Sequence, residues 1–340
     1  MKKRLYRIGI PFIMLVITVL LILFIRNNLP VWKGEDTSEA NVYTKHYVLI
    51  SEDMTTAFWQ GVYQSARQEA EKNDIYLEQI GDDLPEEYTL EDYLRISIAS
   101  KVDGIILCPD GSEEVAKLID EADKKGIPVV TVLKDESDTS RISFVGINSY
   151  ELGLDYGEQI LGQITEATQN IYILFHSSES KSTNDVVFSQ IKKTLNENLG
   201  ENSINIQPYF IANDSEFDSE EAIRDIFIDT ENLPDILVCM EEVDTECACQ
   251  AIVDYNKVGT VTIIGSYSSD IILEAISKKL AALTVTMDTK QLGMQCVQAL
   301  KEYEEMGYVS NYFNADLHII NEDNVDSELK DQSGAIGSKE

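Results

Sequence analysis

The chain has 340 residues, of which 27 are Lys or Arg and 60 are Asp or Glu, so its formal net charge at pH 7 is −33. Residues 1–33 contain six of the basic residues and no acidic residue, which leaves 21 basic and 60 acidic residues, a charge of −39, for the rest. A surface of that sign repels phosphate backbones, so nucleic acid is not expected as a partner.

The amino terminus predicts a membrane anchor. Residues 1–7 are basic, and residues 8–25 are apolar and uncharged, a length at the short end of what spans a bilayer. A cleaved secretory signal is the alternative, but no small-residue cleavage site follows the apolar run. We therefore expect a single-pass protein of the cell membrane, with residues 1–7 in the cytoplasm, a linker over residues 26–43 and an extracytoplasmic remainder.

From residue 44 the chain alternates short apolar runs, typical of buried strands, with segments whose apolar residues recur at helical spacing. In the first half, the predicted strands cover residues 46–50, 75–80, 102–110, 127–132 and 142–148. The predicted helices cover residues 58–73, 90–100 and 113–125. This alternation indicates an α/β fold with a mostly parallel sheet, and ligands bind beyond the carboxyl ends of such strands. We therefore expect the function to lie where Asp110, Lys134 and Asn148 follow their strands.

The same alternation begins again at residue 170. The predicted strands of the second half cover residues 171–175, 204–209, 235–240, 261–265 and 281–285. The predicted helices cover residues 186–195, 219–227, 243–255 and 270–278. Two similar α/β halves predict two lobes, with a cleft between them as the place for a small ligand. The chain becomes polar near its end, so residues 324–340 are predicted to be a disordered tail.

The reactive residue types predict neither catalysis nor a metal or cofactor site. The five cysteines are scattered through apolar segments without the spacing of metal ligands. His46, His176 and His318 are far apart in the sequence, and each is expected to be a packed or surface histidine. Ser177 lies in no Gly-x-Ser-x-Gly turn, and the sequence contains no Gly-rich phosphate loop. We therefore expect a binding protein and not an enzyme.

Several short motifs resemble those of the type I periplasmic binding proteins, the ribose/galactose-type sugar receptors of ABC importers, whose fold is shared by the effector domains of LacI-type repressors. The resemblance covers residues 45–321. The motifs are Phe58-Trp59, Lys-Val-Asp-Gly-Ile-Ile at 101–106, Lys-Gly-Ile-Pro-Val-Val at 125–130, Val145-Gly146-x-Asn148 and Leu292-Gly293. No helix-turn-helix precedes the domain, which excludes the repressor branch.

The resemblance implies a two-lobed fold in which each lobe is a mostly parallel sheet flanked by helices. It also implies that three strands cross between the lobes, so that each lobe is built from separate parts of the chain. The N-terminal lobe is expected to comprise residues 44–148 and 288–312. The C-terminal lobe is expected to comprise residues 149–287 and 313–323.

The resemblance also implies a sugar site with aromatic faces against the ring and with charged or amide groups on its hydroxyls. Phe58 and Trp59 match the aromatic pair of the family, and Thr56 stands just before them where members often carry Asn. Elsewhere the chain departs from the sugar-binding pattern, because Leu133-Lys134 replaces the usual Asp-Arg. Four further candidate ligand-binding residues stand at or near the positions where the family has Arg, Asn, Asp and Gln; in that order they are Asn184, Glu241, Tyr267 and Met287.

These departures leave two hypotheses for the ligand. Several hydroxyl-binding groups are missing together, and each unpaired group in a buried site costs on the order of 1–3 kcal/mol. The first hypothesis is a ligand with fewer hydroxyls than a monosaccharide, with Lys134 and Glu241 facing its polar ends. The second is that the pocket has drifted because the domain signals through lobe closure and does not need tight sugar binding.

We therefore expect an extracytoplasmic receptor that binds a sugar or sugar-like solute by hinge closure. The expected partner is an ABC permease, and the alternative is a membrane-anchored sensor that signals to a histidine kinase.

Overall fold

The computed structural model describes residues 43–52, 54–80, 88–176, 181–200, 203–212 and 215–336. The predicted cytoplasmic end, the membrane span over residues 8–25 and nearly all of the linker lie outside these residues. Among the residues that are described, no helix combines the length and apolar character needed to cross a membrane.

The first lobe contains a six-stranded sheet in the order β11-β5-β4-β3-β1-β2, and all of its neighbouring strands run parallel. Its strands are β1 (Lys45–Ile50), β2 (Ile75–Gln79), β3 (Gly104–Leu107), β4 (Val129–Val132), β5 (Ser143–Gly146) and β11 (Tyr312–Asn314). Its helices are α2 (Ala57–Glu71), α3 (Leu90–Ser100), α4 (Glu113–Lys124) and α10 (Thr289–Met306).

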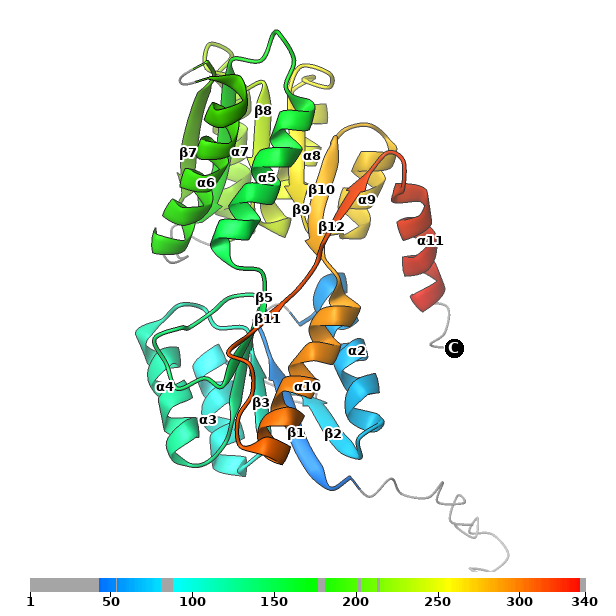
Figure 1. Ribbon diagram of the computed structural model, residues 1–340. Coiled ribbons are helices and arrows are strands. Elements are labelled where there is room, and N and C mark those ends of the chain that lie inside the picture. The colour runs from blue at the N-terminus through cyan, green and yellow to red at the C-terminus, as the bar shows by residue number, and fades with distance from the viewer. Residues whose placement is uncertain are drawn as a thin grey trace, which may run out of the picture. The chain divides into compact units, whose positions relative to one another are not determined.

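The second lobe repeats this arrangement with a sheet in the order β12-β10-β9-β8-β6-β7, in which only β12 runs antiparallel to its neighbour (Figure 1). Its strands are β6 (Asn170–His176), β7 (Asn205–Ile211), β8 (Ile236–Cys239), β9 (Thr262–Ser266), β10 (Leu283–Met287) and β12 (Leu317–Asn321). Its helices are α5 (Ser149–Gln163), α6 (Lys181–Leu199), α7 (Glu216–Ile228), α8 (Glu242–Asp254), α9 (Asp270–Ser277) and α11 (Val325–Ile336). The predicted two-lobed α/β architecture is confirmed.

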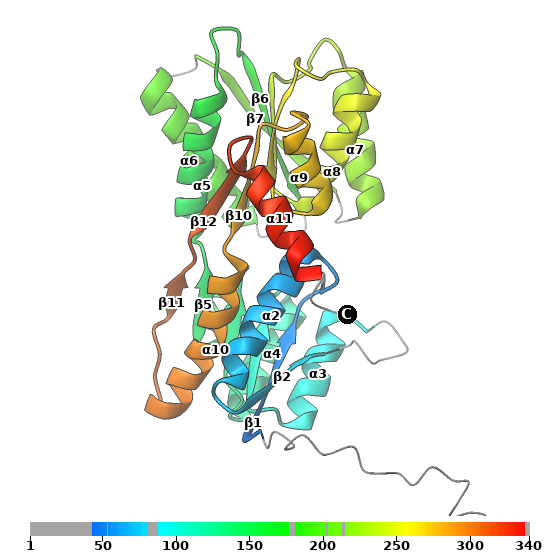
Figure 2. The ribbon, with the colours of Figure 1, turned by 90° about the vertical axis from the view of Figure 1, so that its right-hand side faces the viewer.

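Each sheet is buried on both faces. Successive side chains of a strand point to opposite faces, so each sheet contributes to two separate hydrophobic cores. Along β1, Tyr47 and Leu49 pack with residues of α2 and α10, whereas Val48 and Ile50 pack with residues of α3 and α4. Figure 2 shows α2 and α10 side by side on one face of this sheet. Strands covered on both sides read as continuous apolar runs, which is why the sequence signals them clearly.

The chain passes between the sheets after β5, after β10 and after β11. The third passage lies later than expected, because β11 pairs in register with β5, with Phe313 opposite Val145. Phe313 also packs against the first-lobe core. Residues 313 and 314 therefore belong to the first lobe and not to the second.

The prediction of a disordered tail from residue 324 is wrong for residues 325–336, which form α11. Val325 is buried and Leu329 packs against the core cluster that contains α9. These two apolar residues are four positions apart, so they lie on one face of the helix. The polar composition of the segment conceals this pair. Residues 337–340 lie outside the described part of the chain.

Glycines bring the paired helices of each lobe close together. A Cβ atom at Gly293 of α10 would lie 2.3 Å from the carbonyl oxygen of Val62 in α2. In the second lobe, a Cβ atom at Gly153 of α5 would lie 2.6 Å from the carbonyl oxygen of Val187 in α6. Contacts with backbone atoms cannot be relieved by a rotamer change, so each helix pair requires its glycine.

We predict that Gly293→Ala lowers the free energy of unfolding by about 1–3 kcal/mol, because the added methyl group overpacks the contact between α10 and α2. Gly162→Ala is the matched control, since Gly162 lies in α5 with no heavy atom within 4 Å of the added Cβ. The control should be neutral or raise the free energy of unfolding by up to about 1 kcal/mol. Urea denaturation of both variants measures the difference, and equal stability would contradict the close approach.

Candidate ligand-binding site

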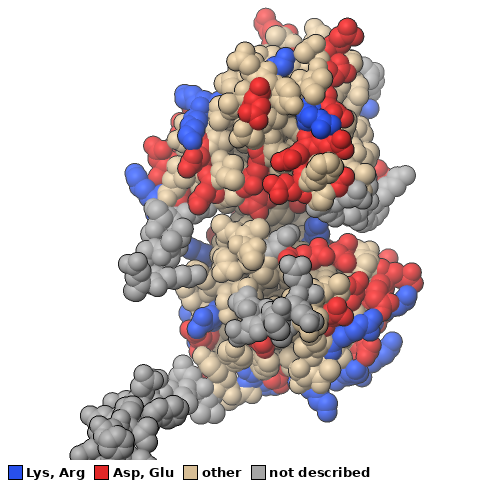
Figure 3. Space-filling model, turned by 180° about the vertical axis from the view of Figure 1, so that it is seen from behind, with Lys and Arg blue, Asp and Glu red and all other residues tan. Residues whose placement is uncertain are grey.

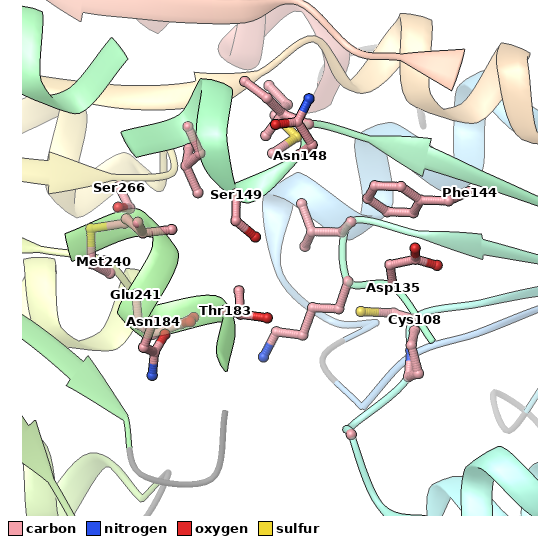
Figure 4. A pocket seen from close by; sticks show the side chains of 18 of the residues that line it. Cys108, Asp135, Phe144, Asn148, Ser149, Thr183, Asn184, Met240, Glu241 and Ser266 are labelled. Carbon is pink, nitrogen blue, oxygen red and sulfur yellow. The ribbon is translucent and has the colours of Figure 1, made fainter. Parts of the chain in front are cut away.

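A cavity of about 660 Å³ lies at the carboxyl ends of the strands of both sheets. The first lobe contributes residues that follow β1, β3, β4 and β5, and the second lobe contributes residues that follow β8 and β9 and the last residues of β10. In Figure 4, Cys108 and Asp135 of the first lobe face Asn184 and Glu241 of the second across the opening, with Asn148 near the passage after β5. This volume is within the range of small-molecule sites.

The structure brings seven of the eight candidate residues together in the lining of this cavity. They are Phe58, Trp59, Lys134, Asn184, Glu241, Tyr267 and Met287. Thr56 does not line the cavity. Its side chain caps α2, where Oγ1 accepts a hydrogen bond from the backbone N–H of Trp59 at 3.4 Å. Thr56 thus fixes the start of the helix that carries the aromatic pair.

The aromatic side chains of the cavity come from both lobes. Phe58 and Trp59 are each 4% exposed, and their rings meet edge to face with centroids 5.7 Å apart. Tyr267, which follows β9 in the second lobe, meets Phe58 edge to face at 5.1 Å. Tyr267 and Met287 also pack against the first-lobe core. The pair of Phe58 and Tyr267 therefore joins the lobes, and such pairs contribute about 0.5–1.5 kcal/mol beyond their buried area.

Leu133 and Tyr267 occupy equivalent places in the two sheets, directly after β4 and β9. Both have left-handed backbones, with φ of 68° and 64°. Each donates its backbone N–H at 3.0 Å to the neighbouring strand, Leu133 to the Val145 carbonyl and Tyr267 to the Val285 carbonyl. Left-handed conformations of residues other than glycine are costly and concentrate at functional sites. Here they turn the chain at the edge of the cavity.

Charged side chains of both lobes act on the thiol of Cys108. Burial raises the pKa of this thiol to about 12, Lys134 opposes the increase, and Glu241 and Glu52 add to it. Lys134 from the first lobe and Glu241 from the second therefore lie within electrostatic reach of one point in the cavity. A thiol with such a pKa is protonated at neutral pH and is a poor nucleophile.

The loop after β4 adds a charged group that sequence reasoning missed. The Arg141 guanidinium, whose side chain is only 6% exposed, donates Nη2 to Asp135 Oδ2 at 2.8 Å and Nη1 to Asn311 Oδ1 at 2.7 Å. Arg141 thus ties the loop to the segment before β11. Glu136 and Asp138 in the same loop also line the cavity. Their position two and four residues after Lys134, in the loop that follows a strand, was the signal that could have identified them.

Buried polar groups fix the second-lobe wall of the cavity. The Asn184 side chain, 3% exposed, donates Nδ2 to the His176 carbonyl at 3.2 Å. His176 Nε2 lies 3.0 Å from each carboxylate oxygen of Asp244, and both side chains are buried. These contacts tie the end of β6 to α6 and to the first turn of α8. Asn184 therefore combines a place in the lining with a structural hydrogen bond.

A second chain of hydrogen bonds lies in the second-lobe wall of the cavity. Ser266 donates its hydroxyl to the Cys239 carbonyl at 2.7 Å, so its Oγ is left to accept from Tyr156 Oη at 2.5 Å. Tyr156 and Ser266 both line the cavity. Burial raises the pKa of the Tyr156 hydroxyl, which therefore stays protonated as the donor. Neither residue was among the candidates from sequence.

The chain matches the family model of the periplasmic binding protein domain over residues 47–307. The chain belongs to this family. Its solved structural relatives include GanP, a glucose-galactose binding protein from Geobacillus stearothermophilus, with 22% identity, a TM-score of 0.72 and coverage of 82% of this chain and 98% of GanP. AraP, an arabinose binding protein from the same organism, has 18% identity, a TM-score of 0.69 and coverage of 83% and 98%.

A third relative is the XylFII-LytSN complex, with 24% identity, a TM-score of 0.68 and coverage of 82% of this chain and 98% of that chain. At these identities the three structures show that the fold is shared. A search of curated protein sequences finds no match. The fold is that of the type I members of the family, which are solute-binding proteins and not enzymes.

We predict that Cys108 resists alkylation in the folded protein although it lines the cavity. Its raised pKa leaves about one thiol in ten thousand ionised at pH 8, against about a quarter of ordinary thiols. Iodoacetamide labelling followed by peptide mass spectrometry should give a rate about a thousandfold below that of the urea-unfolded chain. The rate should rise about tenfold per pH unit up to pH 10. Equal rates in the folded and unfolded chains would contradict the assigned environment.

Proposed function

We propose that the chain is an extracytoplasmic solute receptor that binds a small sugar or sugar-like molecule between its lobes and serves an ABC-type importer. One observation carries the proposal: residues at the strand ends of both sheets line the same cavity, whose volume suits a small ligand. The chain passes between the sheets three times near this cavity. A ligand that contacts both lobes stabilises their closed arrangement by the affinity gained on closure.

The lining supports a ligand with a flat apolar face. Tyr267 presents aromatic surface, the buried rings of Phe58 and Trp59 border the cavity behind it, and Met287 adds an adaptable apolar side chain. Lys134 and Glu241 lie toward opposite walls and suit the polar ends of the ligand. The usual carboxylate of the sugar site is replaced by Leu133, which supports a ligand with fewer hydroxyls than glucose or ribose.

We predict that Tyr267→Asn weakens ligand binding by tenfold or more. Asn tolerates the left-handed backbone of this position, so the change removes the aromatic face without adding strain. Phe217→Asn is the matched control, because Phe217 is 69% exposed on α7 and does not line the cavity. Calorimetry of the full-length chain against pentoses, hexoses, polyols and amines identifies the ligand, and X-ray scattering with and without it measures closure.

Two outcomes of that screen bear on the proposal in different ways. Nanomolar to micromolar binding of glucose or ribose would contradict both a hydroxyl-poor ligand and a drifted pocket. Absence of binding by every solute, together with an unchanged radius of gyration, would contradict the receptor itself.

A second candidate function is a membrane-anchored sensor that signals to a histidine kinase. The structure of XylFII in complex with LytSN supports it, because it shows that a protein of this fold can bind another protein. Closure presents a new surface that combines both lobes, and such a surface suits a permease or a kinase equally.

Deletion of the gene separates the two functions. For the importer role we expect loss of solute uptake with unchanged kinase-dependent transcription, and for the sensor role the reverse. A tagged full-length chain expressed in the deletion strain also tests the proposed anchor over residues 8–25. It should restore the phenotype and stay in the membrane after carbonate extraction, and release into the soluble fraction would contradict an uncleaved anchor.

A further inference from the structure

The cavity is lined by an excess of acidic side chains. Six carboxylates and two cationic side chains are among the described residues that line it. The carboxylates belong to Glu52, Asp110, Asp135, Glu136, Asp138 and Glu241, and the cations to Lys134 and Arg141. Arg141 is committed to Asp135 by a bidentate ion pair. The described lining thus has three times as many carboxylates as cations.

Glu136 and Asp138 form the centre of this excess. Within the described part of the chain, neither carboxylate forms an ion pair with Lys, Arg or His. Asp110 lies near Glu136, and its Oδ1 accepts a hydrogen bond from the backbone N–H of Ser112 at 2.9 Å. Burial raises the pKa of Glu136, and the negative charges of Asp110, Asp135 and Asp138 raise it further. Like charges held this close are stabilised by a positive charge placed among them.

The acidic excess is found on both sides of the cavity. Glu241 belongs to the second lobe, whereas the carboxylates that follow β3 and β4 belong to the first. In Figure 3, acidic side chains lie on both lobes along the junction, while most Lys and Arg side chains of the first lobe lie away from it. Approach of the lobes therefore brings negative charges together, and a cation between them lowers that cost.

An independent feature indicates that the cavity holds a polar ligand. Thr286 on β10 is 7% exposed and lines the cavity, and its Oγ1 has no hydrogen-bond partner among the described residues. Burying a hydroxyl without a hydrogen-bond partner costs free energy, so a bound molecule is expected to supply the missing hydrogen bond. The hydroxyl oxygen can accept a hydrogen bond from an N–H group of a ligand.

The aromatic residues suit the same chemistry. A cation near the faces of Trp59, Phe58 or Tyr267 is attracted by the negative potential of the rings. A bare metal ion is a poorer candidate, because the described residues contain no group of three or more His, Cys, Asp or Glu side chains arranged to hold one. Anionic solutes such as sugar phosphates and uronic acids are disfavoured by the same carboxylates.

We infer that the solute is cationic: a small molecule that carries a protonated amine beside a flat apolar face, as an amino sugar does. This inference rests on the proposed receptor function and specifies its substrate class. The amine lies by Glu136, Asp138 and Asp110, and the apolar face lies on the aromatic side chains.

The test is calorimetry of the full-length chain with matched pairs of probes that differ by an amine. The pairs are glucose and glucosamine, galactose and galactosamine, and 1,4-butanediol and putrescine. We expect at least one amine to bind about tenfold or more tightly than its neutral partner at pH 7. The double variant Glu136→Gln, Asp138→Asn should reduce this preference by about threefold to tenfold. Glu158→Gln on the exposed side of α5 is the matched control and should leave it unchanged.

The pH dependence supplies a second readout. Glu136 binds a cation only when ionised, and its raised pKa means that protonation begins at a higher pH than for an ordinary glutamate. Affinity for the amine should therefore fall as the pH is lowered toward the usual range of glutamate, about 4.3, and the double variant should flatten that fall. N-acetylglucosamine, which has no charge, should show neither effect.

The outcomes distinguish this inference from the function on which it rests. Binding of a neutral probe as tightly as its amine would overturn the cationic solute and leave the receptor intact. A preference for the amine that the double variant retains in full would overturn the assigned carboxylates. Failure of every probe to bind, with no change in the scattering curve, would overturn both the receptor and the inference.

Discussion

The contact between α10 and α2 at Gly293 ties the end of the second sheet to the first lobe. β10 ends in the second lobe at Met287, and the helix that follows packs on the other side of the passage, with its backbone against that of Val62. Because the chain returns in this way, the lobes are joined by several strands and not by one flexible linker. The cavity is bounded by both lobes, and connections of this kind suit the hinge closure proposed for the receptor.

In the proposed receptor, the aromatic contacts and the charges of the cavity act on the same equilibrium between open and closed lobes. The pair of Phe58 and Tyr267 favours approach of the lobes, whereas Glu241 and the carboxylates around Glu136 oppose it. A ligand changes this balance only through contacts that differ between the open and closed arrangements. Aromatic stacking and the neutralisation of carboxylates are both contacts of that kind, so one solute with an apolar face and a positive charge uses each of them.

The strained turns at Leu133 and Tyr267 show how one architecture serves two lobes. Each turn follows the third strand from the edge formed by β11 or β12, and each uses the same hydrogen bond to the neighbouring strand. The side chains at the two turns differ. Leu133 is aliphatic and precedes the charged loop that contains Lys134 and Glu136, whereas Tyr267 is aromatic. Fold symmetry is thus kept by the backbone, and ligand chemistry is decided by the side chains at the strand ends.

The amino-acid sequence by itself determined the two α/β halves, and the resemblance added the two lobes and seven residues of the cavity lining. Buried parallel strands and their polar ends are local patterns, so Lys134 could be assigned from the chain alone, whereas Phe58, Glu241 and Tyr267 were assigned through the resemblance. Only the tertiary structure decided which charges meet. Arg141 pairs with Asp135, Glu136 forms no ion pair within the described part of the chain, and Thr56 caps α2 without lining the cavity itself. Such outcomes depend on distances between residues that are remote in sequence, which periodicity and spacing do not contain.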